Sequence, residues 1–137
     1  MKLCDTSVVV DIDRGGVAER VARLDDEGRH AISAVTVTEL RLGVNIRDDP
    51  ETAAYTDAVE ALDRLLARFD LVEVTRPIAI AAADIIADLQ DSGAALNDLH
   101  DVYIAATART EQLPVLTANV DQFERIDDVH VVDWETY

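Results

Sequence analysis

The chain has 137 residues, of which 28 are acidic and 12 basic, and a formal net charge of −16. Because 49% of the residues are hydrophobic and only 5 Gly and 3 Pro occur, we expect a continuous core and exclude a low-complexity or collagen-like chain. The length fits one domain over residues 1–137. Apolar runs such as residues 8–10 are far shorter than the about 20 residues that cross a bilayer, so no membrane span is expected.

Two further features bear on where the protein works. An acid stands at position 5, where a secretory signal would carry a basic stretch and then an apolar one, so we expect a cytoplasmic protein. Arg outnumbers Lys by 11 to 1, and Asp outnumbers Glu by 19 to 9. Such a surface repels itself in dilute buffer, but at about 1 M salt the Debye length is roughly 3 Å and the repulsion shrinks. The composition resembles that of halophile proteins, and we hypothesise a molar-salt cytoplasm.

The first third of the chain predicts strands that alternate with helices. Residues 2–4 form a short apolar strand, and residues 5–7 (Asp-Thr-Ser) are typical of a helix N-terminus. A helix with an apolar stripe ends near Gly28, before a second strand over residues 30–34. Residues 36–39 (Thr-Val-Thr-Glu) match a capping box, so the next helix is expected to begin there.

The middle of the chain predicts two long helices separated by a strand. Residues 51–69 carry one apolar stripe that includes Phe69, which indicates a helix, and residues 71–74 resemble a strand. Pro77 suits the first turn of another helix that stops near Gly93.

The last third predicts one more helix and two strands. Residues 97–98 (Asn-Asp) suit the cap of a helix that continues past residue 108. Residues 114–117 and 129–132 are short apolar strands, with a turn of helix at 119–123 between them. Apolar strands separated by helices predict an α/β fold, with a central parallel sheet of about four to five strands covered on both faces.

Several acids follow the ends of these strands. Asp5 ends the first strand, Glu39 lies just after the second, and Asp101 opens the helix before the fourth. Asn119 and Asp121 follow the fourth strand. Sites in parallel sheets lie at the carboxyl ends of the strands, so these side chains are expected in one cleft. At about 5 Å and an effective dielectric near 20, each like-charged pair costs roughly 3 kcal/mol, and a hard divalent ion, Mg²⁺ or Mn²⁺, would neutralise the cluster.

Each of these residues also has a purely structural interpretation. Asp5 suits a helix cap, Glu39 suits the capping box, and Asp101 suits the first turn of a helix. Asp98 also suits a cap, although its three-residue spacing places it on the same helical face as Asp101. Asn119 and Asp121 are of types common in turns.

The order of the motifs favours a functional interpretation. Residues 5–7 (Asp-Thr-Ser), 38–43 (Thr-Glu-Leu-Arg-Leu-Gly), 101–108 (Asp-Val-Tyr-Ile-Ala-Ala-Thr-Ala) and 116–119 (Leu-Thr-Ala-Asn) occur in this order. Together they resemble the PIN domain, and most closely the VapC-type toxins of toxin–antitoxin pairs, over nearly the whole chain. The resemblance implies a three-layer sandwich and a metal-dependent endoribonuclease that acts on RNA as a homodimer and is held inactive by a small cognate antitoxin.

The resemblance also assigns roles to individual residues. It places Asp5, Glu39 and Asp101 at the three acidic positions of the family's metal site. Asp5 and Asp101 would hold the ion that activates water for in-line attack on an RNA phosphodiester. Glu39 would bind that ion through water or orient the nucleophile.

The fourth acidic position of the family departs from the usual pattern here. Either Asn119 or Asp121 fills that position. If Asn119 fills it, the amide would orient a water or a phosphate and Asp121 would supply the charge from nearby. Thr117 would fix this loop through its hydroxyl, and Asp98 would add an outer carboxylate.

Three alternatives remain at this stage. Residues 8–13 (Val-Val-Val-Asp-Ile-Asp) resemble the strand and Asp-x-Asp loop of phosphatases that form an aspartyl-phosphate. That chemistry recruits a downstream lysine, but the only lysine is Lys2, so we expect Asp11 and Asp13 to be solvated ends of a short helix. The other two alternatives are a non-catalytic interaction module with the same fold and an RNA-processing nuclease outside a toxin–antitoxin pair.

The remaining chemistry-bearing residues receive structural predictions. His100 adjoins Asp101 but should point about 100° away from it, toward the surface. Tyr103 and Trp134 are expected to pack, and Cys4 is expected to be a small buried side chain. With no basic patch in the sequence, RNA would be held by the metal and a few arginines, for which the candidates are Arg14, Arg41 and Arg47.

Overall fold

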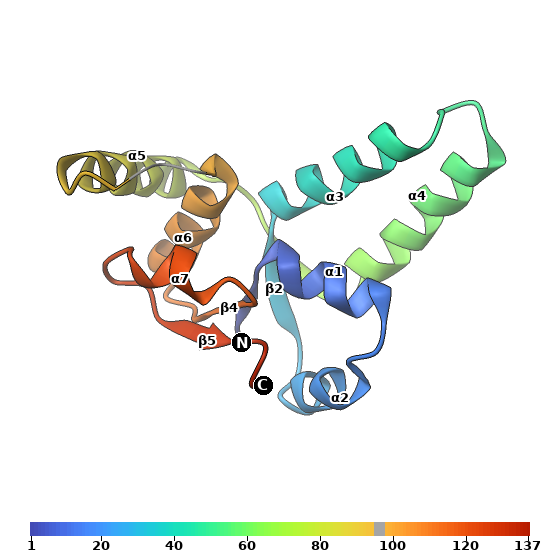
Figure 1. Ribbon diagram of the computed structural model, residues 1–137, viewed down its shortest axis with the longest axis horizontal. Helices are drawn as coiled ribbons and strands as arrows, with labels where there is room; N and C mark the ends of the chain where they lie inside the picture. The colour runs from blue at the N-terminus through green and yellow to red at the C-terminus, as the bar shows by residue number, and fades with distance from the viewer. Residues whose placement is uncertain (95–97) are drawn as a thin grey trace.

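The computed structural model describes residues 1–94 and 98–137, and its centre is a five-stranded sheet in the order β3-β2-β1-β4-β5 (Figure 1). The strands are β1 (Leu3–Cys4), β2 (His30–Ser33), β3 (Phe69–Val72), β4 (Val115–Thr117) and β5 (Val131–Asp133). Every neighbouring pair is parallel. The predicted parallel sheet is therefore confirmed.

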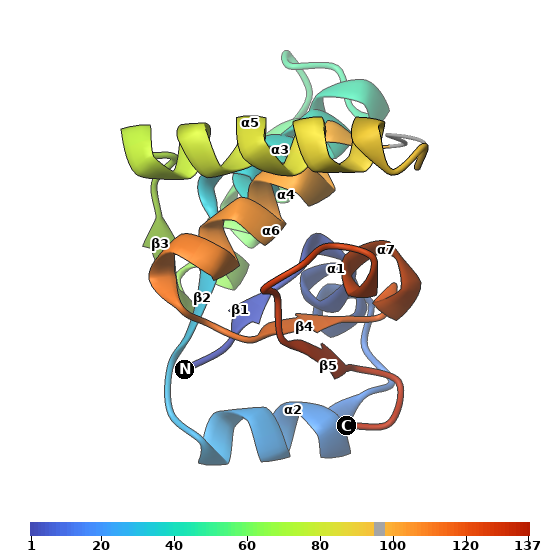
Figure 2. The ribbon, with the colours of Figure 1, turned by 90° about the vertical axis from the view of Figure 1, so that its left-hand side faces the viewer.

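Helices cover both faces of this sheet. They are α1 (Thr6–Arg14), α2 (Ala18–Asp26), α3 (Ala34–Arg47), α4 (Ala53–Leu66), α5 (Arg76–Asp91), α6 (Leu99–Glu111) and α7 (Val120–Glu124). Figure 2 shows α5 and α6 above the sheet and α2 below it. Figure 1 shows α3 and α4 as a helical pair that projects to one side. No described helix combines the length and the apolar character that a membrane crossing requires.

Two hydrophobic cores arise from the alternation of side chains along the strands. Leu3, Ala31 and Val115 share one core with the buried faces of α5 and α6. Cys4, Ile32 and Leu116 point to the opposite face and share a second core with α1, α2 and Trp134. The three layers of the fold follow from this alternation, because neighbouring residues of one strand belong to different cores.

The expected packing roles of Cys4 and Trp134 are confirmed, since both side chains are fully buried. Burial raises the pKa of the Cys4 thiol to about 12, so the unreactive thiol form dominates at neutral pH.

The capping-box prediction for residues 36–39 was wrong. Helix α3 begins two residues earlier, and Ser33 caps it by accepting a hydrogen bond from the backbone N–H of Val35 at 3.1 Å. Thr36 is buried inside the first turns of α3, and its hydroxyl lies 3.0 Å from that of Thr6. The sequence pattern indicated Thr36 as the cap, but Ser33, at the end of β2, also carries a hydroxyl and caps the helix instead.

The predicted helix over residues 51–69 was too long. Helix α4 ends at Leu66, and Phe69 begins β3, where it pairs with His30 and is 7% exposed. The predicted strand over residues 71–74 is accordingly shifted by two residues, and Leu71 is exposed on the edge strand. The spacing of Phe69 fits a helical stripe, but Phe69 lies in β3, where pairing with β2 places it in a buried position.

The two helices that follow match their predicted limits closely. Gly93, at a φ of 73°, follows the end of α5 in a conformation that glycine adopts without steric cost. Asp98 caps α6 as predicted, and its Oδ1 accepts a hydrogen bond from the backbone N–H of His100 at 2.8 Å. The expectation for Asn97 lies outside the described residues.

Candidate functional site

Asp5 occupies the point where β1 turns into α1. It is only 3% exposed, and its Oδ1 accepts a hydrogen bond from the backbone N–H of Thr6 at 2.7 Å. Its Oδ2 accepts hydrogen bonds from the hydroxyls of Ser7 at 2.9 Å and Thr117 at 2.8 Å. Asp5 is the helix cap that the structural interpretation predicted, and these donors also hold its carboxylate in one orientation.

The loop after β4 is tied to Asp5 through hydroxyl groups. Thr117 Oγ1, while donating to Asp5, accepts a hydrogen bond from the backbone N–H of Asn119 at 2.9 Å. Ser7 Oγ accepts from the backbone N–H of Ala118 at 3.1 Å. The sequence predicted that the Thr117 hydroxyl fixes this loop, and the structure confirms that contact.

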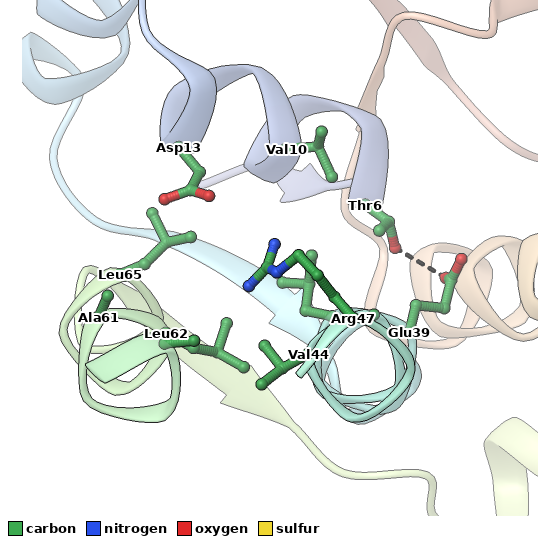
Figure 3. Close-up of a pocket in the computed structure, with 12 residues that line it drawn as sticks. Thr6, Val10, Asp13, Glu39, Val44, Arg47, Ala61, Leu62 and Leu65 are labelled. Atoms are coloured by element: carbon green, nitrogen blue, oxygen red, sulfur yellow. Dashed lines mark hydrogen bonds between the residues drawn. The ribbon is translucent and has the colours of Figure 1, made fainter. Parts of the chain in front are cut away.

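Glu39 reaches the same region from α3. Thr6, in the first turn of α1, donates its hydroxyl hydrogen bond to Glu39 Oε1 at 2.8 Å (Figure 3). Because Thr6 also contacts Thr36, two side chains of α3 are tied to the start of α1. One oxygen of Glu39 is thereby anchored, and the half-buried carboxylate is held near Asp5.

The beginning of α6 brings three further polar side chains. Asp98 is the cap, and Asp101 lies half-buried in the first turn. His100 Nδ1 lies 3.4 Å from Asp98 Oδ1 and 3.8 Å from Glu39 Oε2. His100 is a surface residue as expected, with 40% of its side chain exposed, but α3 places Glu39 close to its ring, a contact that the sequence analysis did not predict. The spacing of residues along α6 does not predict the contact between His100 and Glu39, because Glu39 lies on another helix.

These carboxylates are partly buried and close enough to repel one another. Burial raises the pKa of Asp101 to about 7, and the negative charges of Asp5, Asp98 and Glu39 add to the effect, with Arg125 acting in the opposite sense. Burial also raises the pKa of Glu39 above its ordinary value, despite the hydrogen bond from Thr6 and the proximity of His100. The predicted convergence of Asp5, Glu39 and Asp101 is thus present in the structure.

The other predicted site residues lie at the margin of this cluster. Asn119 is exposed at the N-cap position of α7, and its side chain makes no capping hydrogen bond. Asp121 is exposed in the first turn of α7.

The donor set fits a divalent cation. Carboxylate oxygens are the ligands that Mg²⁺ and Mn²⁺ prefer, and an excess of negative charge at short range favours capture of such an ion. Glu39, Asp98 and His100 each offer a ligand atom, and these atoms all lie within 4.8 Å of one another. Asp5 and Asp101 are outside this 4.8 Å group but close enough for the charges of Asp5, Asp98 and Glu39 to act on Asp101.

A groove of about 410 Å³ opens beside Glu39, between α1, α3 and α4. Figure 3 shows its apolar wall, with Glu39 and Asp13 toward its sides and the Arg47 side chain across its middle. The wall includes Val10, Val44, Leu62 and Leu65. The groove therefore joins an apolar surface to the acidic cluster, and the sequence analysis did not identify it.

The three arginines proposed to contact RNA each have a nearby partner. Arg14 lies 3.9 Å from Asp11, Arg47 donates to Asp48 at 3.2 Å, and Arg41 donates to the Tyr55 hydroxyl at 2.8 Å. All three are exposed, so their contact with RNA remains a prediction.

The structure contradicts the resemblance of residues 8–13 to the aspartyl-phosphate loop. Residues 8–13 lie within α1, where that motif would need a strand followed by a loop. Asp11 is also less solvated than expected, because its Oδ2 accepts a hydrogen bond from the buried indole of Trp134 at 3.1 Å.

Comparison with known proteins identifies the family. A family model described as PIN domain matches residues 2–129. The chain belongs to the PIN-domain family. A relative of this PIN domain is Ribonuclease VapC1 of Rickettsia felis, which is 32% identical over 134 residues, with 95% of this chain and 93% of the relative covered.

Solved structures agree with this assignment. The PIN domain described here resembles FitAcB from Neisseria gonorrhoeae at 30% identity and a TM-score of 0.82, with 100% of both chains covered. It also resembles VapBC-5 of Mycobacterium tuberculosis, a member of the VapBC family of toxin–antitoxin systems, at 25% identity and a TM-score of 0.69. That match covers 96% of this chain and 97% of the other. The resemblance drawn from the ordered motifs is confirmed.

Proposed function

We propose that this PIN domain is a metal-dependent endoribonuclease that hydrolyses RNA phosphodiester bonds. The observation that carries the proposal is the convergence of Asp5, Glu39 and Asp101 at the carboxyl edge of the sheet, where burial, and after it the neighbouring negative charges, raise the pKa of Asp101 to about 7. The name of the Rickettsia felis relative, Ribonuclease VapC1, supports the reaction class.

Asp5 and Asp101 would hold Mg²⁺ or Mn²⁺. Such an ion, when bound, supplies electrophilic stabilisation of the phosphoryl oxygens and lowers the pKa of water. Asp5 is suited to a fixed ligand, since hydrogen bonds from Thr6, Ser7 and Thr117 orient it. Asp101 is suited because cation binding relieves the repulsion it experiences.

Glu39 would position the attacking water. Its Oε1 is anchored by Thr6, and a carboxylate whose pKa lies above the ordinary value is a stronger base at neutral pH. Asn119 and Asp121 would face the RNA from the exposed start of α7, with Asn119 orienting water or phosphate and Asp121 adding charge at longer range. Asp98 would serve as an outer carboxylate.

The decisive experiment is a cleavage assay on structured RNAs with Mg²⁺, Mn²⁺ or EDTA, in dilute buffer and in molar KCl. Asp101→Asn and Asp5→Asn should each lower the cleavage rate by about a hundredfold or more, because each removes a charge that acts on the reacting groups. Asp84→Asn, an exposed change on α5, is the matched control and should cleave normally.

Melting temperatures separate loss of chemistry from loss of structure. Asp101→Asn should remain folded, because it removes a carboxylate that its neighbours repel. Full activity of both active-site variants would refute the assignment. Metal binding by the wild type without any RNA cleavage would instead support the non-catalytic interaction module.

We also propose that the groove beside Glu39 receives an inhibitory antitoxin. Its apolar wall between α1, α3 and α4 suits the apolar face of an amphipathic helix, and the acids at its Glu39 end suit a cationic side chain of that partner. The similarity to a member of a toxin–antitoxin system supports this class of partner.

The antitoxin proposal is tested by searching for a small reading frame beside the gene of this chain and by measuring whether its product inhibits RNA cleavage. Ala61→Arg places a bulky cation in the groove and should abolish inhibition, whereas Ala54→Arg, exposed on the same helix outside the groove, should not. Equal inhibition of both variants would contradict the assignment of the groove. Absence of any inhibitory neighbour would favour an RNA-processing nuclease.

A homodimer is the remaining part of the proposal. Val35, Val74 and Tyr103 line a shallow, largely apolar hollow of about 230 Å³, and we assign this surface to a second copy of the chain. Light scattering should give a dimer for the wild type and a monomer for Val74→Asp, with Ile46→Asp on the exposed face of α3 as the control. A monomeric wild type would contradict this part of the proposal.

A further inference from the structure

Glu39, Asp98 and His100 form a cluster that differs chemically from the all-carboxylate pair Asp5 and Asp101. Their ligand atoms lie within 4.8 Å of one another, and all three side chains are partly exposed, so an ion can enter from solvent. His100 Nδ1 lies 3.4 Å from one carboxylate oxygen and 3.8 Å from another. Both separations exceed the 2.7–3.2 Å typical of a good N–H···O hydrogen bond, so direct hydrogen bonding does not account for the arrangement.

Each member of the cluster is held in place by the fold. Glu39 Oε1 accepts from Thr6, which leaves Oε2 as the oxygen nearest His100. Asp98 is fixed as the cap of α6, and His100 follows it by two residues in the first turn. Two helices from distant parts of the chain therefore present a preformed set of two carboxylates and one imidazole.

The imidazole determines which ions suit this set. Mg²⁺ binds oxygen ligands almost always, whereas Mn²⁺, Co²⁺ and Zn²⁺ also accept an imidazole nitrogen. We infer that Glu39, Asp98 and His100 form a second cation position, beside the Asp5 and Asp101 carboxylates, that selects a nitrogen-accepting divalent ion such as Mn²⁺ over Mg²⁺. The inference deepens the proposed metal-dependent nuclease, on which its catalytic meaning rests, and it makes His100 a determinant of metal selectivity.

The test is a titration of the chain with Mn²⁺, with and without Mg²⁺ as competitor. Electron paramagnetic resonance measures the concentration of free Mn²⁺ at each step and so gives the affinity. We choose pH 8, because imidazole and carboxylate ligands bind a metal ion in their deprotonated forms. His100→Gln should weaken Mn²⁺ binding by about tenfold or more, while Mg²⁺ binding changes by less than about twofold. His130→Gln, at an exposed histidine just before β5, is the matched control and should change neither affinity.

A second variant tests the carboxylate. Asp98→Asn preserves the helix cap, because Asn caps helices about as well as Asp, and it should weaken the binding of Mn²⁺ while the melting temperature is maintained. Unchanged Mn²⁺ affinity in His100→Gln would overturn the inference, as would an equal loss of Mn²⁺ and Mg²⁺, which would make His100 only a positioning residue.

The outcomes also separate this inference from the proposed function. If His100→Gln loses the Mn²⁺ preference but the wild type cleaves no RNA with any ion, the cation position stands and the nuclease proposal fails. If RNA cleavage requires Asp101 but Mn²⁺ preference is independent of His100, the nuclease proposal stands and the second position is refuted.

Discussion

Asp101 illustrates how a single residue changes its chemistry through its neighbours. An acid in the first turn of a helix is ordinarily stabilised in its charged form by the helix dipole. Here burial and the charges of Asp5, Asp98 and Glu39 outweigh that effect and raise the pKa of Asp101 to about 7. A bound cation therefore stabilises the ionised form of this carboxylate more than it stabilises that of an isolated surface acid.

The raised pKa predicts that metal affinity depends on pH. A ligating carboxylate must lose its proton, so the affinity for Mg²⁺ should rise by about tenfold per pH unit as the pH approaches 7 and should level off above it. Calorimetric titrations between about pH 5.5 and 8.5 would measure this dependence, and Asp101→Asn should largely lose it. Equal wild-type affinities at pH 6 and pH 8 would contradict the prediction.

The raised pKa of Asp101 also determines how the free energy of unfolding of the metal-free protein depends on pH. The pKa of the folded state exceeds the ordinary value of 3.8, so the folded state binds its proton more tightly than the unfolded state. The contribution to stability is present below about pH 4 and is lost as the pH rises to about 7. Bound cations reverse the balance, since they favour the ionised form.

At the scale of the element, α6 ends in a strained conformation. Gln112 is the C-cap residue and has a φ of 56°, in the left-handed region that glycine adopts with less steric cost. Gln112→Gly should therefore raise the free energy of unfolding by about 0.5 to 1 kcal/mol. Ala83→Gly, exposed in the interior of α5, should lower it by about 1 kcal/mol. Chemical denaturation measures both, and a destabilised Gln112→Gly would show that the cap is not strained.

At the ends of helices and strands, a local sequence pattern did not always determine the structure. Thr36 and Glu39 have the spacing of a capping box, but both side chains contact Thr6 of α1, and Ser33 caps the helix. Phe69 has helical spacing relative to Leu62 and Leu65, but it pairs in β3. In each case the local pattern was compatible with two structures, and contact with another element selected one of them.

At the scale of the whole molecule, the net charge of −16 dominates. Many of the acids are exposed, so their mutual repulsion destabilises the folded state in dilute buffer. The melting temperature should rise substantially between dilute buffer and about 1 M KCl, where the Debye length is roughly 3 Å. Thermal denaturation monitored by circular dichroism would test this, and a melting temperature that is independent of KCl would refute the halophilic hypothesis.

The amino-acid sequence by itself determined the layered α/β fold, because alternating strand and helix patterns depend on local spacing and burial. It also placed Asp5 and Asp101 at the correct edge, since each adjoins the end of an element whose direction is set by the parallel sheet. Only the tertiary structure decided that His100 faces Glu39 and that Thr6 anchors Glu39. Those contacts join helices that are far apart in the chain, and their geometry depends on how α1, α3 and α6 pack, which no local pattern specifies.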